Sequence, residues 1–507
     1  MYALGHELAH TPSHKFDLAH MRVLLKALEH PEQKFPSVLI AGTNGKGSTA
    51  ATLASILQAS GLCTGLYTSP HLVRINERIR INGAEISDDK FALIHDLVDR
   101  TAERLVEDGD LPWHPSFFEM LTAMGFEHFA TSKVDIAVLE VGMGGRLDAT
   151  NVVEPRLGVI TDISLDHQKF LGSTIAEISR EKAGIIRPGG IVVTLPQSPE
   201  ANDVIGNTIL ERDARAINAA PYVPPVSPQS PNYIHFENES NAGNREGTNH
   251  VGTALLLHPV ERNSTSSVPA PAFSFSNGYA PAAEQRQSAA HRASHRIASG
   301  RPPAPKRQKK PTSRYPLQVL GKEITVETPL LGRHQLRNIA LAIAAAEELH
   351  NQGFPVTADS IERGIRETRW PGRFQVIPGT PEIVLDVAHN PAGAWALRST
   401  LSACYEDRRL IFVFGAMRDK AISEIAEILF PLADSVIVTT ADNPRSATPD
   451  EIREAASRTQ TEIESCPDVP SAVARARELT PTDGIIVVTG SIYIVGEAMR
   501  ALGVSVE

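Results

Sequence analysis

The stretch SVLIAGTNGKGST, Ser37 to Thr49, joins a short apolar run to a glycine-rich turn and to the start of a helical pattern. The run 37–40 predicts a strand, and the run 49–57 predicts a helix. A strand that leads through a glycine-rich turn into a helix is the geometry that binds phosphate, because backbone N–H groups and the helix dipole both face the turn. Lys46 adds a positive charge, so the stretch predicts a nucleoside triphosphate site. The alternative is a plain glycine turn without a ligand.

The motif departs from the standard P-loop, which has four residues between its glycines and a Ser or Thr directly after the lysine. Ile40 occupies the position expected for the first glycine, and Gly47 separates Lys46 from Ser48. This departure argues against an ordinary GTPase or ATPase. It favours a relative that has its own form of the loop.

Strand and helix patterns alternate along the first part of the chain. The runs VDIAVLEV (134–141) and LGVIT (157–161) predict buried parallel strands, and residues 117–129 and 174–183 predict helices. This alternation indicates an α/β arrangement with a largely parallel sheet.

A second alternating unit begins near Phe374. Its predicted strands are EIVLDV (382–387), LIFVF (410–414), SVIVTT (435–440) and GIIVVT (484–489), and its predicted helices are 394–403, 421–429 and 449–458. We therefore predict two doubly wound α/β domains. The first is a P-loop N-terminal domain, like that of ATPases, over residues 1–368. The second is a smaller Rossmann-like C-terminal domain over residues 375–507, after a linker at 369–374 that contains Pro and Gly.

Residues 222–314 differ in composition from the rest of the chain. They hold 12 of the 36 prolines and many Ser, Asn and Ala, and they show no sustained period. Such a segment cannot bury enough apolar surface to offset its ordering entropy, so we expect a disordered insertion into the first domain. Its basic end, RPPAPKRQKKPTSR, could contact an anionic partner, or it could be a solvated linker.

The composition limits the class of protein. The 42% of hydrophobic residues can form a normal core, and the net charge of −10 argues against a role in nucleic-acid binding. The cysteines, Cys63, Cys404 and Cys466, are far apart, match no metal-binding spacing and are interpreted as reduced thiols. With neither an apolar signal core nor a stretch of about 18 apolar residues, we expect a cytoplasmic monomer that does not bind membranes.

Several polar residues follow predicted strands, where doubly wound folds bind ligands. Glu140 ends an otherwise apolar strand, which is costly for a carboxylate unless it is paired or metal-bound. His167 follows the next strand, but imidazole is an unusual ligand for Mg²⁺, so the chemistry leaves its role open. Lys182 has the pattern of a solvated helix lysine. Asp386 and His389 end the first strand of the second unit, and Arg373 in the linker could meet a phosphate or form a boundary salt bridge.

Nine short motifs occur together and in order along the chain. Together they resemble the folylpolyglutamate synthase/dihydrofolate synthase family of the Mur ligase superfamily, outside residues 222–314. The motifs are AGTNGKGST (41–49), YTSPHL (67–72), FFEMLTA (117–123), LEVGMGGRLDATN (139–151), SLDHQKFLG (164–172), EKAGI (181–185), GRHQLRN (332–338), WPGRF (370–374) and LDVAHNP (385–391).

The resemblance implies roles for individual residues. ATP is expected to contact Asn44, Gly45, Lys46, Gly47, Ser48, Asn338, Arg373 and Asp386. Mg²⁺ is expected at Ser69, Glu140 and His167. The pterin substrate is expected near Ser69 and near Phe117, Phe118, Glu119, Leu147, Asp148 and Ala149. Lys182 is typically carbamylated in this family, and His389 is expected near the transferred phosphate or the glutamate. The group Arg418-Asp419-Lys420 resembles a family motif whose role stays open.

The resemblance also implies an ATP-dependent ligase that adds L-glutamate to dihydropteroate, to tetrahydrofolates, or to both. ATP would activate the acceptor carboxylate as an acyl phosphate, with Lys46, Lys182, Arg373 and His389 as the catalytic group. Two alternatives remain. One is a peptidoglycan-precursor amino-acid ligase of the same superfamily, whose members carry a threonine-rich P-loop instead of GKGS. The other is a nucleotide-dependent switch or scaffold.

Overall fold

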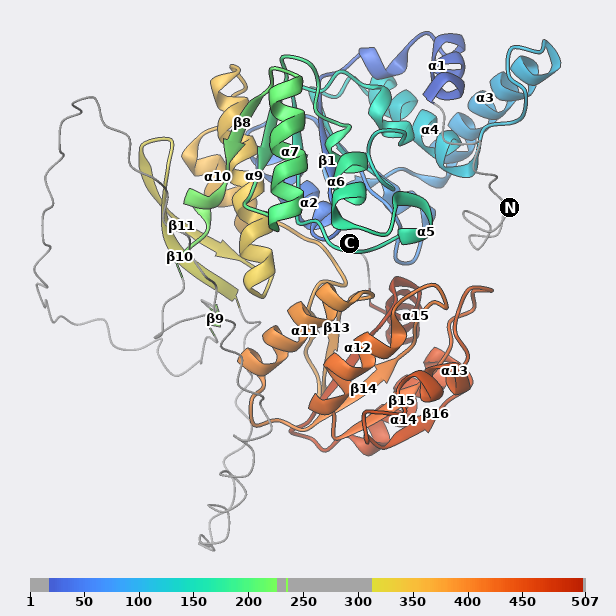
Figure 1. The fold of residues 1–507 in the computed structure, drawn as a ribbon, viewed down its shortest axis with the longest axis vertical. Helices are drawn as coiled ribbons and strands as arrows, with labels where there is room; N and C mark the ends of the chain where they lie inside the picture. The colour runs from blue at the N-terminus through green and yellow to red at the C-terminus, as the bar shows by residue number, and fades with distance from the viewer. Residues whose placement is uncertain (1–17, 226–233, 236–311, 505–507) are drawn as a thin grey trace, which may run out of the picture. The chain divides into compact units, whose positions relative to one another are not determined.

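The computed structural model describes residues 18–225, 234–235 and 312–504. Its first sheet has eight strands in the order β4-β3-β2-β5-β1-β6-β7-β8, and all neighbours are parallel except β2–β3 and β3–β4. Its strands β1 and β8 are labelled in Figure 1. The strands are β1 (Ser37–Ala41), β2 (Thr64–Tyr67), β3 (Ile79–Ile81), β4 (Ala84–Glu85), β5 (Ile136–Glu140), β6 (Leu157–Ile160), β7 (Ile191–Thr194) and β8 (Arg215–Asn218).

The central position of β1 follows from its sequence. All five of its residues are buried, as expected for a parallel strand covered on both faces. Successive side chains point to opposite faces, so Leu39 and Ala41 join one apolar cluster and Val38 and Ile40 join another. The helices that contribute to these two layers are α1 (Leu18–Ala27), α2 (Lys46–Ala59), α3 (Asp88–Glu107), α4 (Phe117–Thr131), α6 (Ile175–Ala183), α7 (Pro199–Glu211), α9 (Arg333–Asn351) and α10 (Ala358–Glu367).

The six-stranded sheet has the order β12-β13-β17-β14-β15-β16 and is parallel except for β12–β13. Its strands are β12 (Gln375–Ile377), β13 (Glu382–Leu385), β14 (Leu410–Phe414), β15 (Ser435–Val438), β16 (Ile463–Ser465) and β17 (Ile485–Thr489). Apolar residues of α11 (Pro391–Cys404), α12 (Ile422–Leu429) and α13 (Pro449–Ala455) form one cluster with the sheet. Those of α14 (Val469–Leu479) and α15 (Ile492–Leu502) form the other.

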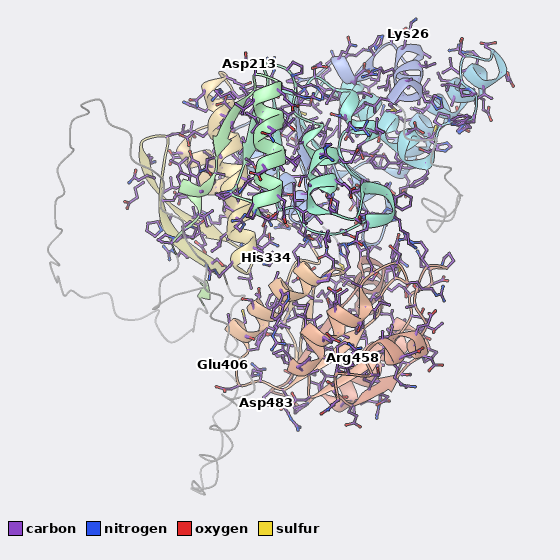
Figure 2. The ribbon with its side chains drawn as sticks, in the orientation of Figure 1. Lys26, Asp213, His334, Glu406, Arg458 and Asp483 are labelled. Carbon is purple, nitrogen blue, oxygen red and sulfur yellow. The ribbon has the colours of Figure 1, made fainter. Side chains whose placement is uncertain are left out.

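These two sheets confirm the predicted α/β class. We refer to the elements from α1 to α10 as the P-loop part and to those from β12 to α15 as the C-terminal part. Contacts hold the described residues of both parts in one compact unit, so the boundaries at 368 and 375 stay a prediction. Charged residues such as Lys26, Asp213, Glu406 and Asp483 are exposed and lie on the outside of the fold (Figure 2).

The predicted limits of the insertion were wrong at both ends. Most of 222–314 lies outside the described residues. However, Tyr222 ends a short 3-10 turn and donates its hydroxyl to Glu347 of α9. The strand β10 (Thr312–Val319) already begins before residue 314, because Ser313 and Tyr315 alternate with exposed neighbours and are buried. It pairs with β11 (Lys322–Thr328) and β9 (Ile234–His235) in a small antiparallel sheet.

No helix in the described ranges is long and apolar enough to cross a membrane.

Candidate active site

The glycine-rich turn has a conformation that only its glycines allow. Gly42 has φ +150° and Gly45 has φ +92°, both in the region that disfavours side chains. A Cβ on Gly42 would lie 1.8 Å from Thr161 Oγ1, and a Cβ on Gly45 would lie 2.1 Å from Asn338 Oδ1. The turn then opens α2 at Lys46. The turn therefore leads from β1 to the positive end of α2, which is the strand–turn–helix arrangement that the sequence predicts.

The turn is anchored through the loop after β6. The backbone N–H groups of Thr43 and Asn44 donate to the carbonyl oxygen of Asp162 at 2.9 and 3.1 Å. The guanidinium of Arg337 from α9 contacts both carboxylate oxygens of Asp162, with N···O distances from 2.6 to 3.2 Å. The neighbouring Asn338, a predicted nucleotide contact, packs over Gly45. Helix α9 therefore holds the turn in two ways, through the Arg337–Asp162 ion pair and through the packing of Asn338 on Gly45.

Two lysines meet at the carbonyl oxygen of Gly42. Lys182 Nζ lies 2.7 Å from this oxygen and Lys46 Nζ lies 3.2 Å from it. Lys182 is buried, and its burial together with the charge of Lys46 lowers its pKa from 10.5 to about 7. The expectation of a solvated helix lysine from local pattern was therefore wrong. A substantial fraction of Lys182 is a neutral amine near neutral pH, which is the form that reacts with CO₂.

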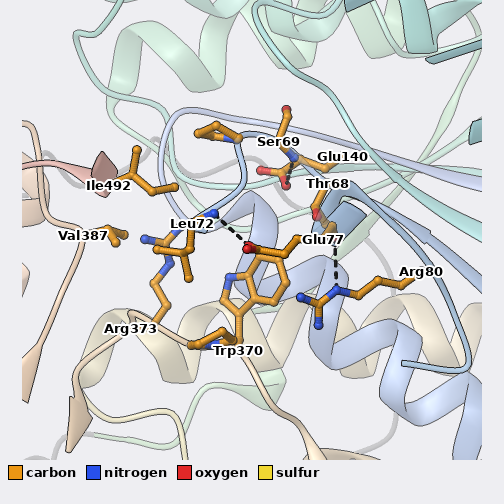
Figure 3. A pocket seen from close by; sticks show the side chains of 12 residues that line it. Thr68, Ser69, Leu72, Glu77, Arg80, Glu140, Trp370, Arg373, Val387 and Ile492 are labelled. Carbon is orange, nitrogen blue, oxygen red and sulfur yellow. Dashed lines mark hydrogen bonds between the residues drawn. The ribbon is translucent and has the colours of Figure 1, made fainter. Parts of the chain in front are cut away.

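A pocket lies beside this turn and brings together three of the predicted site residues (Figure 3). Ser69, Glu140 and Arg373 all line it, and it encloses about 420 Å³ including its open mouth. Glu140 is 5% exposed and accepts a hydrogen bond from the Ser69 N–H at 3.1 Å. Burial raises the pKa of Glu140, against the opposing charges of Lys46 and Arg373. This buried carboxylate would be stabilised by a cation.

The donor set is compatible with Mg²⁺. In the described part of the chain, no group of three or more His, Cys, Asp or Glu is arranged to hold a metal ion by itself. Mg²⁺ usually binds one or two carboxylates together with substrate phosphates and water, so Glu140 and the Ser69 hydroxyl beside a nucleotide would suffice. Burial lowers the pKa of His167 to about 4, and the charges of Lys420 and Lys46 add to this effect while the carboxylate of Asp166 opposes it. A neutral imidazole can act as a metal ligand.

The linker contributes an arginine and an unexpected tryptophan. Arg373 lies within electrostatic reach of Glu140 and Asp386. The carboxylate of Asp386 accepts hydrogen bonds from the backbone N–H groups of Phe374 and Ala388, both at 2.8 Å, so it ties the linker to the end of β13. Burial raises the pKa of Asp386 despite the charge of Arg373.

Trp370 also lines the pocket and packs against the first turn of α2. A Cβ on Gly47 would lie 2.8 Å from the Trp370 ring. The unusual glycine after Lys46 therefore makes room for this tryptophan. The sequence interpretation quoted the WPGRF motif but did not assign Trp370 a role, because nothing local to the motif indicates its distant partner.

Four of the predicted substrate residues have structural contacts. Phe117 lies under the buried guanidinium of Arg78, which is 5.5 Å from the ring centroid. Glu119 closes a capping box at the start of α4 and accepts from the Ser116 N–H at 2.7 Å. The SFFE sequence at 116–119 is a readable signal for this cap.

The remaining predicted residues are Phe118 of α4 and, in the loop after β5, Leu147, Asp148 and Ala149. Asp148 accepts from the Thr150 hydroxyl at 2.6 Å and from the Met143 N–H at 2.9 Å, and burial raises its pKa. Phe118 packs against Gly142, where a Cβ would lie 2.5 Å from the ring. Neither these residues nor Leu147 and Ala149 line the pocket of Figure 3, and their contact with a pterin stays a prediction.

The chain is similar to known proteins in sequence and in fold. Residues 372–492 match the family model of the Mur ligase glutamate ligase domain. The chain is 30% identical over 487 residues to the dihydrofolate synthase/folylpolyglutamate synthase of Bacillus subtilis, covering 96% of this chain and 94% of that protein. It is similar to the folylpolyglutamate synthase of Mycobacterium tuberculosis complexed with ADP and AMPPCP, with a TM-score of 0.75 and 29% identity over 96% of each chain. It is also similar to E. coli FolC in complex with DHPP and ADP, with a TM-score of 0.71 and 25% identity over 98% of this chain and 95% of that one.

Proposed function

Because the chain belongs to the dihydrofolate synthase/folylpolyglutamate synthase family, we propose that it is an ATP-dependent ligase that adds L-glutamate to dihydropteroate and to reduced folates. The pocket beside the phosphate-binding turn carries this proposal. Its wall combines Ser69, Glu140 and Arg373, and Lys46 lies within electrostatic reach of Glu140. A negatively charged donor and acceptor can therefore meet there.

The reaction follows from the chemistry of carboxylates. A carboxylate is a poor acyl donor, so the enzyme must transfer the γ-phosphoryl group of ATP to it, which forms an acyl phosphate and releases ADP. The amine of L-glutamate then attacks the acyl carbon, an amide forms and phosphate leaves. No nucleophile from the protein is needed. The catalytic task is to align the substrates and to neutralise charge on the transferred phosphoryl group.

Lys46 and Arg373 supply positive charge for this task, since both act electrostatically on Glu140. Lys46 begins α2 at the phosphate-binding turn, and Arg373 reaches the pocket from the linker. Ser69, Glu140 and His167 would hold Mg²⁺, which supplies further charge neutralisation for the phosphates. We also propose that Asn44 to Ser48, Asn338 and the linker residues contact the nucleotide, and that His389 lies near the transferred group.

Lys182 has the properties of a residue that becomes carbamylated. Its amine is buried, and its pKa is lowered to about 7 by that burial and by Lys46. Reaction of the neutral amine with CO₂ would form a carbamate and release a proton. The carbamate would replace a positive charge beside Lys46 with a negative one, and it would give the site a further oxygen ligand.

The folate names of the curated relatives support this reaction over that of a peptidoglycan-precursor ligase. We propose dihydropteroate, tetrahydrofolates and L-glutamate as the substrates, a monomer as the working form and the cytoplasm as the compartment.

One assay tests the proposal. Phosphate release from ATP is measured with L-glutamate and with dihydropteroate, tetrahydrofolate or a UDP-muramyl peptide in turn. We expect glutamate-dependent release with the two pteridine acceptors and none with the muramyl peptide. Lys46→Ala is the control and should abolish turnover. ATP binding without glutamate-dependent release would favour a switch, and release with only the muramyl peptide would favour the peptidoglycan ligase.

A further inference from the structure

Three charged residues follow β14, and each contacts a different partner. They are Arg418, Asp419 and Lys420. Arg418 pairs with Glu451 at 3.1 Å, and both side chains are about half exposed. Asp419 accepts from Arg445 at 2.8 Å. Both contacts stay within the C-terminal part, where Arg418 contacts α13 and Asp419 contacts the loop before α13. Lys420 makes a different kind of contact, because it reaches the P-loop part.

Lys420 forms a largely buried ion pair with Asp166. Its Nζ lies 2.7 Å from Asp166 Oδ1, and the two side chains are 10% and 9% exposed. A buried ion pair is stable only when further hydrogen bonds satisfy its members. Asp166 has such bonds, since it accepts from the His167 N–H at 2.8 Å and from Asn390 Nδ2 at 3.3 Å. His389 Nε2 lies 3.6 Å from the same carboxylate.

The same network includes the phosphate-binding turn. Asn390 Nδ2 also donates to Asn44 Oδ1 at 3.0 Å, and Asn44 Nδ2 donates to Ser164 Oγ at 3.1 Å. Asn390 in turn begins α11 as its N-cap residue. A continuous chain of polar contacts therefore joins the turn, the loop that carries His167, and the carboxyl ends of β13 and β14.

We propose that Lys420 and Asp166 are positioning residues whose ion pair fixes the His167 loop and the phosphate-binding turn against His389 and Asn390 of the C-terminal part. For its activity readout, the inference rests on the proposed function. The competing role for Lys420 is direct binding of an anionic substrate. The structure favours positioning, because a lysine that left Asp166 for a substrate would leave a buried carboxylate without its cation.

The test compares Lys420→Met, Asp166→Asn and the double variant in the full chain. Each single variant should lower kcat at saturating substrates by roughly 100-fold, which is the effect of a displacement of about 1 Å in a reacting complex. KM for each substrate and nucleotide affinity should change little, because the contacts of the turn itself remain. The double variant should lose little more than either single variant, since one interaction is removed in all three.

Two further variants separate positioning from general destabilisation. Arg418→Gln removes a half-exposed pair from the same loop and should leave kcat and the melting temperature near the wild-type values. Lys420→Arg keeps the charge and should restore part of the lost kcat. A Lys420→Met variant that raised KM for glutamate or folate at unchanged kcat, with Asp166→Asn active as wild type, would overturn the proposal.

A measurement that does not depend on activity keeps the inference separate from the proposed function. Hydrogen exchange of the backbone amides in residues 163–171 should be faster in Lys420→Met than in wild type, and unchanged in Arg418→Gln. Equal exchange in all three proteins would overturn the positioning role. If the wild-type protein released no phosphate with any folate acceptor, the proposed function would fail, but the exchange experiment would still decide this inference.

Discussion

Lys46 and Lys182 share one acceptor, since the side-chain nitrogens of both lie within hydrogen-bond distance of the carbonyl oxygen of Gly42, at 3.2 and 2.7 Å. Two ammonium groups at one oxygen repel each other, and Lys182 is also buried. One of the two amines therefore loses its proton more easily than an isolated lysine would. Burial is the larger cause of the lowered pKa of Lys182, and the charge of Lys46 at the shared oxygen adds to it.

The first prediction concerns the pH dependence of stability. The pKa of Lys182 is about 7 in the folded protein and 10.5 in its ordinary state, so between these values the unfolded chain binds a proton that the folded chain does not. The contribution of Lys182 to the free energy of unfolding therefore rises with pH from about 7 to 10.5, by on the order of a few kcal/mol. In Lys182→Met this rise should be missing.

Urea denaturation of both proteins at pH 7 and pH 9.5, in buffer depleted of CO₂, measures the effect. The free energy of unfolding of Lys182→Met minus that of wild type should be larger at pH 7 than at pH 9.5. Parallel pH profiles for the two proteins would show that Lys182 keeps an ordinary pKa in the folded state.

The second prediction concerns the metal. Glu140→Gln keeps the shape of the side chain and its contact with Ser69 but removes the negative charge that a cation needs. The apparent affinity for Mg²⁺ in the phosphate-release assay should fall by at least ~100-fold. Glu348→Gln is a suitable control, because Glu348 is also a buried carboxylate but pairs with Arg215. It should change stability and leave the Mg²⁺ dependence as it is. An unchanged Mg²⁺ dependence in Glu140→Gln would remove Glu140 from the metal site.

The third prediction concerns the glycine that distinguishes this turn from the standard P-loop. In Gly47→Ala the new methyl group would lie 2.8 Å from the rigid Trp370 ring. Overpacking of this kind costs about 1–3 kcal/mol, so kcat/KM for ATP should fall by roughly 10- to 100-fold. A smaller side chain in Trp370→Leu gives the methyl group room. Gly47→Ala should therefore cost much less in the Trp370→Leu background than in wild type. An equal cost in both backgrounds would mean that Trp370 does not explain Gly47.

The sequence predicted those strands and helices that have a clear apolar pattern or turn motif within their own residues. The β1 strand and the helix α2 follow directly from an apolar run and a glycine-rich turn, and LIFVF matches β14 at both ends. The strands β12 and β16 were missed because each has three residues, which is too short for an alternating pattern to appear.

The site was less predictable because its contacts connect distant segments. The burial of Lys182 depends on Gly42, 140 residues away, and the helical pattern around Lys182 alone pointed to solvent. The role of Lys420 was left open for the same reason, since its partner Asp166 is 254 residues away. The resemblance supplied the site residues as a set. It could not supply the partner of each one, because a pairing is a property of the folded chain.

The fourth prediction concerns the contact between α15 and the loop that carries Ser69. Gly496 lies in α15, and a Cβ there would be 2.0 Å from the carbonyl oxygen of Leu72. Leu72 itself packs on the apolar cluster of the C-terminal part, and Arg500 donates to the Val73 carbonyl at 3.3 Å. In Gly496→Ala the backbone at Leu72 must therefore move, and with it the loop that carries Ser69 into the pocket.

Gly496→Ala should lower kcat/KM by at least ~10-fold, because displacing a positioned group by about 1 Å is costly for the reaction. The intrinsic stability of the helix should increase, since Ala is more favourable than Gly in a helix interior by about 1 kcal/mol. Gly206→Ala in α7 is the matched control, because a Cβ there meets no atom within 4 Å. It should raise the melting temperature and leave activity unchanged. If both variants kept full activity, the close approach of α15 to Leu72 would have no part in positioning Ser69, and the pocket would depend on the linker and the phosphate-binding turn instead.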